Sequence, residues 1–227
     1  MRPDAAILVF IHGGYWRWGS SKEFSLVARG LVSRGITVVV TNYSLCPQVA
    51  ISEITRQSRA VIAWLHREGL RSYGNPARAF VAGHSAGGQQ VARLAATDWS
   101  GEYGLPADII KGGASISGIF DLHPLRYSYL QPTLQLTHEV ILRESPLLNI
   151  PPSGPPLLVS FGGSESPEFR RQSSEYPDAW KASGLRGDLL IQEGRHHFSA
   201  IDGLADPKSA LCEALGDFIS RCGEGHR

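Results

Sequence analysis

The sequence has few cysteines, no long apolar run and no block of like charges. Its three cysteines, Cys46, Cys212 and Cys222, are an odd number without metal-ligand spacing, which predicts reduced thiols in a cytoplasmic protein. The apolar stretch from Ile7 to Ile11 is too short for a signal peptide or a membrane span. The net charge is +1 without a basic run, so we expect neither nucleic acid nor a membrane as partner.

The composition is that of one globular domain. With 227 residues, 42% of them hydrophobic, the chain is long enough to bury a sizeable core, and we expect a single domain over residues 1–227. The proline-rich stretch 151–156 is interpreted as a stiff connector inside this domain. No internal repeat is visible, and no cofactor is expected.

Apolar strand-like segments alternate with helical ones along the chain. The predicted strands are 7–11, 36–41, 79–83, 112–117, 156–161 and 187–192, and the predicted helices are 20–34, 52–68, 86–97, 167–183 and 207–221. This alternation predicts an α/β fold with a doubly wound, mostly parallel sheet, in which strand 36–41 is covered by helices on both faces. We expect residues 121–150 to form a small cap beside the site.

A serine framed by two glycines is the strongest chemical signal. Ser85 lies in Gly83-His84-Ser85-Ala86-Gly87, between a predicted strand and a predicted helix. A strand-to-helix turn this sharp strains the backbone at the serine and crowds its neighbours, so the glycines have a steric cause. Because the spacing alone is weak, the strand before it and the helix after it carry the interpretation of Ser85 as a nucleophile.

A glycine turn follows the first predicted strand, in His12-Gly13-Gly14-Tyr15-Trp16. Acyl transfer develops negative charge on the substrate oxygen, which backbone N–H groups of such a turn can meet together with the N–H of the residue after the nucleophile. We predict Gly14, Tyr15 and Ala86 as these oxyanion donors, with Gly13 as a further candidate. His12 is predicted to brace the loop and not to act as a base.

The acid and the histidine of a triad should follow the last two strands, in the chain order Ser, acid, His. Glu165 is the first carboxylate after strand 156–161, and Glu168, in the first turn of the next helix, is the fallback. Asp121 follows a strand too early and is predicted to be structural. The acid would hold the imidazole in the right tautomer and stabilise its protonated form.

Two adjacent histidines follow the last strand. We prefer His197 to His196 as the base because Phe198 could anchor the loop in the core. A metal site at the histidine pair lacks a third ligand at recognisable spacing, so no metal is predicted. The remaining histidines are interpreted as surface or cap residues: His66, His123, His138 and His226.

Substrate recognition is where the signals are weakest. Trp16 and Tyr127 are predicted to contact substrate, and Trp18 and Tyr43 are further candidates for an aromatic wall, although loop packing explains each aromatic equally well. Arg17 and Arg126 are candidates for meeting a substrate carboxylate, against the simpler interpretation that they are solvated.

Together these motifs resemble the kynurenine formamidase (arylformamidase) group of the α/β-hydrolases, which merges into the esterases and lipases with a His-Gly-Gly oxyanion loop. The resemblance covers nearly the whole chain and includes these further runs: 117–125, 145–147, 165–173 and 197–198. It implies a serine hydrolase that cleaves a small-acyl amide or ester, such as N-formylkynurenine, through a Ser-His-Glu triad. A short-chain carboxylesterase is the alternative, and a non-catalytic ligand-binding relative is disfavoured by the intact residue set. Family members usually have Asp where this chain has Glu165.

The resemblance also makes one prediction about the sheet. Hydrolases of this fold normally have two more strands ahead of the one that begins here at Ile7. Without them, strand 36–41 becomes an apolar sheet edge with unpaired backbone groups. We expect this edge to pair with a second copy of the chain or to be covered by a partner.

Overall fold

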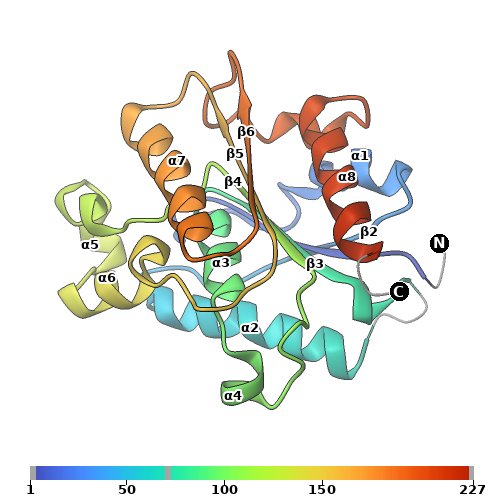
Figure 1. Ribbon diagram of the computed structural model, residues 1–227. Coiled ribbons are helices and arrows are strands. Elements are labelled where there is room, and N and C mark those ends of the chain that lie inside the picture. Colours follow the sequence, from blue (N-terminus) through green and yellow to red (C-terminus); the bar gives the residue numbers. More distant parts are fainter. Residues whose placement is uncertain (1–3, 70–72, 225–227) are drawn as a thin grey trace.

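The protein is built on one parallel sheet, seen edge-on through the middle of Figure 1. The computed structural model describes residues 4–69 and 73–224. Six strands lie in the order β2 (Thr37–Thr41), β1 (Ile7–Ile11), β3 (Ala79–His84), β4 (Gly112–Ile116), β5 (Leu157–Gly162) and β6 (Gly187–Gln192), and every neighbouring pair is parallel. The predicted α/β class and all six predicted strands are confirmed, with ends that differ by one residue at most.

Helices cover both faces of this sheet (Figure 1). On one face lie α1 (Ala28–Ser33) and α8 (Ala210–Glu224), and on the other lie α2 (Ile51–Arg67), α3 (Ala86–Ala95) and α7 (Pro167–Ala182). The β1 strand shows why both faces must be covered. Its odd-numbered residues join the core cluster that includes α2 and α3, whereas Leu8 and Phe10 join the cluster of α1 and α8.

The first helix begins later than predicted. Residues 21–24 form turns, followed by the 3₁₀ helix η1 (Ser25–Val27) and then by α1. The Ser20 hydroxyl donates to Glu23 at 3.1 Å, and the Ser21 N–H donates to the Asn42 side chain at 2.7 Å. Such side-chain bonds compete with helical ones and tie this segment to the chain after β2.

The expected cap consists of short helices between β4 and β5. These are η3 (His123–Tyr127), α5 (Gln131–Leu134), α6 (His138–Glu144) and η4 (Pro146–Leu148). Leu130 and Leu134 anchor the cap in the core. Its Glu144 is 2% exposed and accepts a hydrogen bond from the Thr55 hydroxyl of α2 at 2.9 Å. The same carboxylate forms an ion pair with Arg93 of α3 at 3.4 Å. Outside the cap, the described elements are completed by η2 (Pro76–Arg78), α4 (Trp99–Tyr103) and η5 (Asp202–Ala205).

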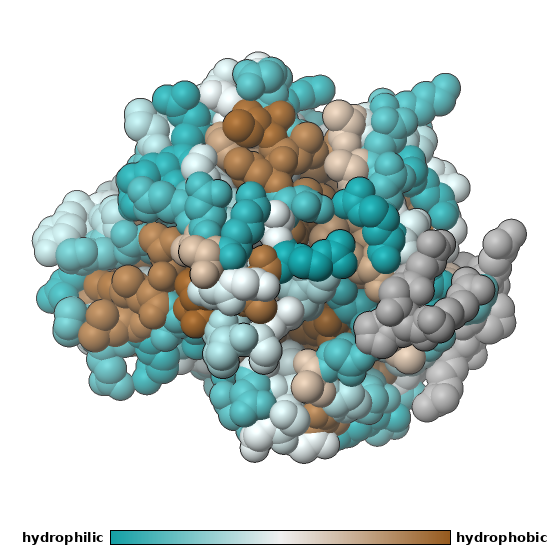
Figure 2. Space-filling view, in the orientation of Figure 1, coloured by the Kyte–Doolittle hydropathy of each residue, from teal (hydrophilic) through white to brown (hydrophobic). Residues whose placement is uncertain are grey.

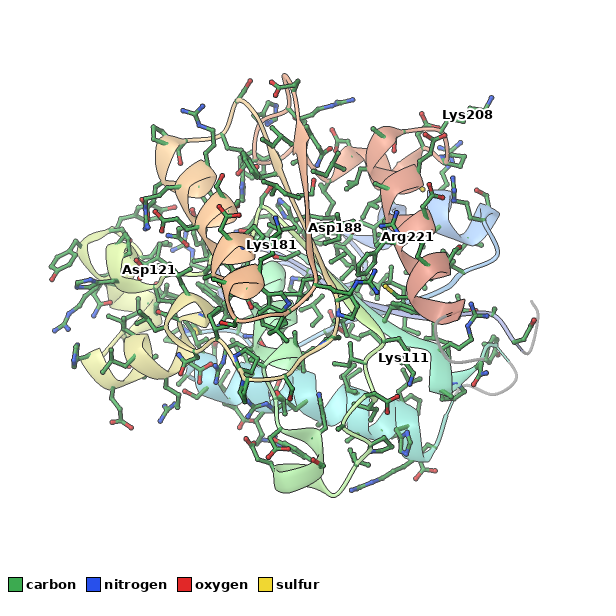
Figure 3. The ribbon with its side chains drawn as sticks, in the orientation of Figure 1. Lys111, Asp121, Lys181, Asp188, Lys208 and Arg221 are labelled. Atoms are coloured by element: carbon green, nitrogen blue, oxygen red, sulfur yellow. The ribbon has the colours of Figure 1, made fainter. Side chains whose placement is uncertain are left out.

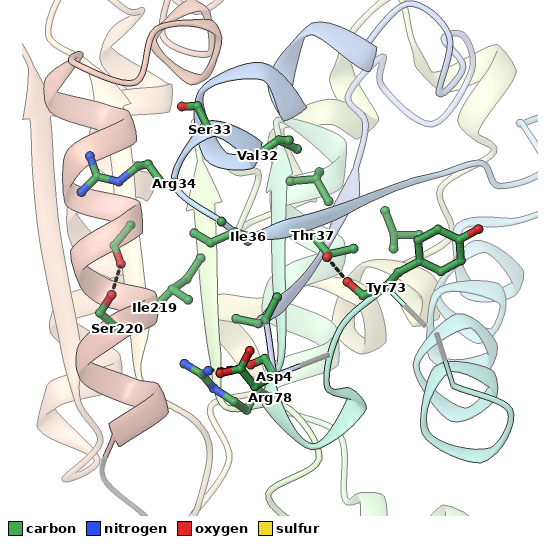
Figure 4. A pocket seen from close by; sticks show the side chains of 16 residues that line it. Asp4, Val32, Ser33, Arg34, Ile36, Thr37, Tyr73, Arg78, Ile219 and Ser220 are labelled. Carbon is green, nitrogen blue, oxygen red and sulfur yellow. Dashed lines mark hydrogen bonds between the residues drawn. The ribbon is translucent and has the colours of Figure 1, made fainter. Parts of the chain in front are cut away.

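The two edge strands are only partly covered. As expected, β2 lies at one edge, and four of its five residues are half-buried. Val39 packs on the core cluster of α2 and α3, and Val38 and Val40 pack on that of α1 and α8, so the predicted helix cover is present on both faces but partial. Beside it lies a hollow of about 1080 Å³ between β2 and α8, where the Thr37 hydroxyl donates to the Tyr73 carbonyl (Figure 4). At the other edge, Asp188 of β6 pairs with Arg221 of α8 at 3.0 Å (Figure 3).

The exposed apolar side chains gather in a few separate areas of the surface. On the face viewed in Figure 2, brown areas are interrupted by hydrophilic side chains. Leu189 and Ile191 of β6 are 38% and 45% exposed, as expected for an edge strand with one open face. Within residues 4–69 and 73–224, no helix combines the length and apolar character that crossing a bilayer requires.

Candidate active site

The predicted site residues meet at a point where the chain changes direction in the sheet. From β1 the chain passes through α1, on one face of the sheet, to β2 at the edge. From β3 it passes through α3, on the other face, to β4, which lies in the opposite direction along the sheet. Loops that diverge in this way leave a crevice at the carboxyl ends of their strands, where open α/β sheets bind ligands. Gly13 follows β1 and Ser85 follows β3. The hollow beside β2 contains neither, so chemistry and not cavity size locates the site.

The turn at Ser85 is strained and crowded, as its sequence predicts. Ser85 has φ 56° and ψ −116°, and its N–H donates to the Ile116 carbonyl at 2.9 Å. A Cβ on Gly87 would lie 2.0 Å from the Ile11 carbonyl oxygen, and one on Gly83 would lie 2.3 Å from the Gly87 oxygen. Both positions therefore require glycine. The α3 helix begins directly after the serine, so its positive end faces the reacting position.

The glycine turn after β1 is left-handed at three consecutive residues. The φ values are 117° at Gly14, 48° at Tyr15 and 56° at Trp16, and the Gly14 carbonyl accepts from the Arg17 and Trp18 N–H groups at 3.0 and 3.2 Å. In the described part of the chain, no hydrogen bond uses the N–H of Gly14 or Tyr15. The strained turn thus leaves these two predicted donors available to a substrate oxygen.

This turn packs directly against the nucleophile. A Cβ on Gly13 would come within 3.1 Å of the Ser85 Cβ. The third predicted donor, the Ala86 N–H, belongs to the first residue of α3, where an N–H has no partner within its helix. The three predicted oxyanion donors therefore lie on segments that border Ser85.

His12 has the contacts of a brace. Its Nδ1–H donates to the Gly13 carbonyl at 2.7 Å, its ring stacks on Tyr43 at 4.3 Å, and burial lowers its pKa. The Tyr43 hydroxyl donates to the His12 carbonyl at 3.0 Å, and burial raises the pKa of this hydroxyl. Tyr43 is 9% exposed, so it supports the turn and is not part of an aromatic wall.

Trp16 also differs from its prediction as a substrate contact. Its side chain is 0% exposed, and its indole N–H donates to Gln89 Oε1 at 3.3 Å. The Gln89 amide in turn donates to the Glu144 carbonyl of the cap at 2.8 Å. The left-handed backbone of the turn directs the indole into the core, where it connects the oxyanion turn to α3 and the cap. No motif spacing marks Gln89 for this role.

Glu165 is fully buried and fully hydrogen-bonded. Its Oε2 lies 2.8 Å from Nδ1 of His197, and its Oε1 accepts from the Ser117 hydroxyl at 2.5 Å and from the Gly162 N–H at 2.7 Å. Burial acts to raise the pKa of Glu165, but these three hydrogen bonds outweigh it and the pKa is lowered. The carboxylate is therefore ionised beside the imidazole, as the acid of a triad should be.

The fallback acid Glu168 lies elsewhere. Its carboxylate binds Arg171 at 2.6 Å and Gln172 at 2.8 Å, and the Arg171 hydrogen bond lowers its pKa. Asp121, labelled in Figure 3, has the structural role predicted for it, because its carboxylate accepts a hydrogen bond at 2.9 Å from the N–H of His123, the first residue of η3. It also lies 3.4 Å from Arg171.

The two adjacent histidines point to different partners. His197 contacts Glu165 as described, whereas His196 is exposed and its Nδ1 accepts from the Ser199 N–H at 3.2 Å. Phe198 is 69% exposed, so the expectation that it anchors this loop in the core is wrong. The buried Ala200 anchors the loop instead, through its N–H to the His196 carbonyl at 2.9 Å.

Three supporting residues escaped the sequence analysis. Phe169 packs on the His197 ring at 4.3 Å, and His84 lies 4.7 Å from that ring on another side. Ser117, which binds Glu165, has φ 51° at the end of β4. His84 occupies a variable position of the glycine-framed motif, and nothing in the sequence brings Phe169 or Ser117 to the histidine.

The rim of the site is exposed. Tyr127 is 79% exposed and its ring contacts only His123 among described rings, at 5.7 Å, so it does not line the site as predicted. Ser128 is extended after η3, and the next tyrosine reaches the oxyanion turn instead: the Arg17 guanidinium lies 5.6 Å above the Tyr129 ring. Trp18 is 47% exposed, and Arg126 is also exposed.

The described residues contain no cluster of three or more His, Cys, Asp or Glu side chains with metal-ligand geometry. They contain a strained serine, backbone N–H donors beside it, and a histidine that is bonded to a buried carboxylate and whose ring lies 4.7 Å from that of His84, the residue before the serine. This combination fits nucleophilic acyl transfer.

Comparisons with known proteins agree with this chemistry. A family model described as the alpha/beta hydrolase fold matches residues 8–145. The kynurenine formamidase of Danio rerio is 32% identical over 96% of this chain and 74% of that protein, and that of Salmo salar is 34% identical over 93% and 72%. The structure of Thermogutta terrifontis esterase 2, phosphoramylated by tabun, superimposes with a TM-score of 0.80 at 20% identity, covering 98% of this chain and 86% of that one.

Proposed function

Since this chain belongs to the α/β-hydrolase family, in the group that contains the kynurenine formamidases, we propose that it is an arylformamidase that cleaves an aryl formamide such as N-formylkynurenine. The similarity to these hydrolases supports a hydrolase that acts on amide or ester bonds. The observation that carries the narrower proposal is the similarity to two kynurenine formamidases along nearly the whole chain.

In the proposed mechanism Ser85 attacks the formyl carbon. His197 takes the serine proton and later returns it to the leaving amine, while Glu165 holds the imidazole through Nδ1 so that Nε2 is free for proton transfer. The tetrahedral intermediate collapses to a formyl-enzyme and the free aryl amine. Water, activated by the same histidine, then releases formate and regenerates Ser85.

The N–H groups of Gly14, Tyr15 and Ala86 stabilise the oxyanion in this proposal. Two of them come from the left-handed turn and the third from the start of α3, so they approach from two rigid segments. Donors fixed in this way need little reorganisation when the charge develops, and each is worth about 3–4 kcal/mol in comparable sites.

We assign the leaving-group side to the rim formed by Arg17 and Tyr129. The amine released from N-formylkynurenine carries an amino-acid carboxylate beside an aromatic ring. Arg17 follows the oxyanion turn, is exposed, and has no carboxylate partner among the described residues, while Tyr129 beside it offers an aromatic face. This pair supplies the charge and the surface that such a leaving group needs.

Kinetics on matched substrates test the proposal. The measurement is kcat/KM for formyl, acetyl and butyryl derivatives of one aryl leaving group, together with N-formylkynurenine and p-nitrophenyl acetate. We expect a steep fall from formyl to butyryl, and turnover of N-formylkynurenine at least as efficient as that of the acetate ester. A preference for butyryl over acetyl, with no cleavage of N-formylkynurenine, would leave a short-chain carboxylesterase instead.

We also propose a cytoplasmic location and self-association, each on a separate observation. Cys46, Cys212 and Cys222 are all free and buried, which suits a reducing compartment. The edge position of β2 supports pairing of this strand with a second copy of the chain. Light scattering at high concentration tests the latter, and a monodisperse monomer would contradict it.

A further inference from the structure

His84 lies between two segments of the candidate site, the loop that carries His197 and the turn that begins at Gly13. Its Nε2 is 2.9 Å from the backbone carbonyl of His197, and the two rings lie 4.7 Å apart. On its other side, a Cβ on Gly13 would come within 2.9 Å of His84 Nδ1. The imidazole therefore contacts both the loop that carries the base and the strand end that begins the oxyanion turn.

The contact with His197 fixes the tautomer of His84. A carbonyl oxygen only accepts hydrogen bonds, so Nε2 must carry the proton and donate it. Nδ1 then has a lone pair, and it is buried without a hydrogen-bond partner among the described residues. The side chain therefore has one N–H donor and uses it in the hydrogen bond to the His197 carbonyl.

His84 is also kept uncharged. Burial and the neighbouring His197 lower its pKa to about 4, although the bond to the His197 carbonyl and the charge of Glu165 act in the opposite direction. In the proposed mechanism His197 becomes positively charged at each proton transfer. A neutral ring beside it tolerates that charge, whereas a second imidazolium would repel it.

We propose that His84 is a positioning residue, which holds the backbone of His197 through the Nε2–H bond and so keeps the catalytic imidazole aligned between Glu165 and Ser85. This inference rests on the proposed acyl transfer at Ser85, but not on the identity of the acyl group. Misalignment of a reacting group by about 1 Å can cost about 100-fold in rate. A single backbone bond at the base-carrying loop is thus enough to affect turnover.

The test is a matched pair of variants, His84→Gln and His84→Met. The Gln amide nitrogen lies as many bonds from Cα as Nε2 of His84 and can donate the same bond, whereas Met places a methyl group there. With p-nitrophenyl acetate, we expect Gln to keep kcat within about 3-fold and Met to lose about 10- to 100-fold in kcat, with KM changing less than about 2-fold in both. Equal kcat in the two variants would overturn the proposal.

A measurement on the unmodified protein covers the case in which the Met variant does not fold. Nitrogen-15 spectra of the histidines at neutral pH should show His84 as the Nε2–H tautomer, and the Nδ1–H tautomer would overturn the proposal. Labelling of Ser85 by a fluorophosphonate separates this question from the proposed function. If the wild type is not labelled, the acyl-transfer mechanism is wrong, whereas a labelled wild type with equally active Gln and Met variants contradicts only the role of His84.

Discussion

The centre of the candidate site and its rim are built in opposite ways. At the centre, Ser85 is 2% exposed and the Glu165 side chain is 0% exposed, with three hydrogen bonds on the carboxylate. At the rim, Tyr129 and Trp18 are 74% and 47% exposed, and Arg17 lies over the Tyr129 ring. Several contacts therefore fix each side chain at the centre, whereas few contacts fix the side chains at the rim.

This difference separates chemistry from specificity. Buried groups with several bonds are held in one geometry, and losing a reacting group there removes the reaction. Exposed side chains with single contacts add modest affinity and can be exchanged at low cost in stability. We therefore expect substitutions at the centre to change kcat and those at the rim to change KM.

The largest effect tests the centre at its nucleophile. Ser85→Ala should lower kcat by about 10⁶-fold and leave folding intact, because triad residues act as a unit and only binding and the oxyanion donors remain. Steady-state kinetics and circular dichroism measure the two parts. A variant that keeps more than about a tenth of the wild-type kcat excludes Ser85 as the nucleophile.

The next effect contrasts neighbours that differ only in burial and partners. His197→Ala and Glu165→Ala should each lower kcat by at least about 10⁴-fold. His196→Ala and Glu168→Ala are the matched controls and should change kcat little, because these side chains bind Ser199 and Arg171. The measurement is kcat for all four, and reversed severity within either pair would reassign that role.

A conservative change at Glu165 sharpens the same contrast. Glu165→Asp should retain substantial activity, since the resemblance to the kynurenine formamidases implies Asp at this position, although the shorter carboxylate cannot keep all three bonds unchanged. We expect a loss of about 10- to 100-fold in kcat with little change in KM. A loss as large as that of Glu165→Ala would show that this site depends on the longer side chain.

At the rim, the expected effect is smaller and falls on KM. Arg17→Met should raise KM for N-formylkynurenine about 3- to 10-fold and leave KM for p-nitrophenyl acetate unchanged, because only the first substrate carries a carboxylate. Arg126→Met is the control on the cap. Equal effects on both substrates would mean that Arg17 supports the turn and does not recognise a carboxylate.

The last effect is on stability and not on turnover, and it depends on pH. The pKa of His84 is lowered from 6.5 to about 4 in the folded protein, so the unfolded chain takes up the proton first as the pH falls. The contribution of the neutral imidazole to stability is complete above about pH 6.5. It is lost as the pH falls from there to about 4, with a slope of at most about 1.4 kcal/mol per pH unit.

Urea unfolding of the wild type and of His84→Gln across this range isolates that contribution. The difference in unfolding free energy between the two should shrink as the pH falls. The titratable groups that act on His84 in the folded protein are His197, which lowers its pKa, and Glu165, which raises it. A difference that is constant from pH 7 to pH 4 would contradict the assigned burial of a neutral imidazole.

The sequence predicted the centre better than the rim for a physical reason. A buried strand, a glycine that permits no side chain and a triad in fixed chain order constrain local sequence, so Ser85, Glu165 and the turn at Gly14 could be located from patterns. Side-chain direction at Trp16, Tyr127 and Phe198 depends on tertiary contacts and on the left-handed backbone of the turn, which no local pattern reveals.

The same limit applies to residues that act from a distance along the chain. Ser117 and His84 reach Glu165 and His197 across 48 and 113 positions, and only the folded sheet brings them together. The start of α1 was misplaced for a related reason, because the Asn42 side chain that holds Ser21 comes from the far end of β2.

One measurement tests the central claim, acyl transfer at a buried Ser85, most directly. A fluorophosphonate reacts with an activated serine and leaves a stable adduct. Trypsin releases Ala79–Arg93, a peptide in which Ser85 is the single hydroxyl-bearing residue. We predict one adduct per chain, on this peptide, and none on the Ser85→Ala protein. An unlabelled Ala79–Arg93 peptide from a preparation that hydrolyses aryl formamides or esters would contradict the account.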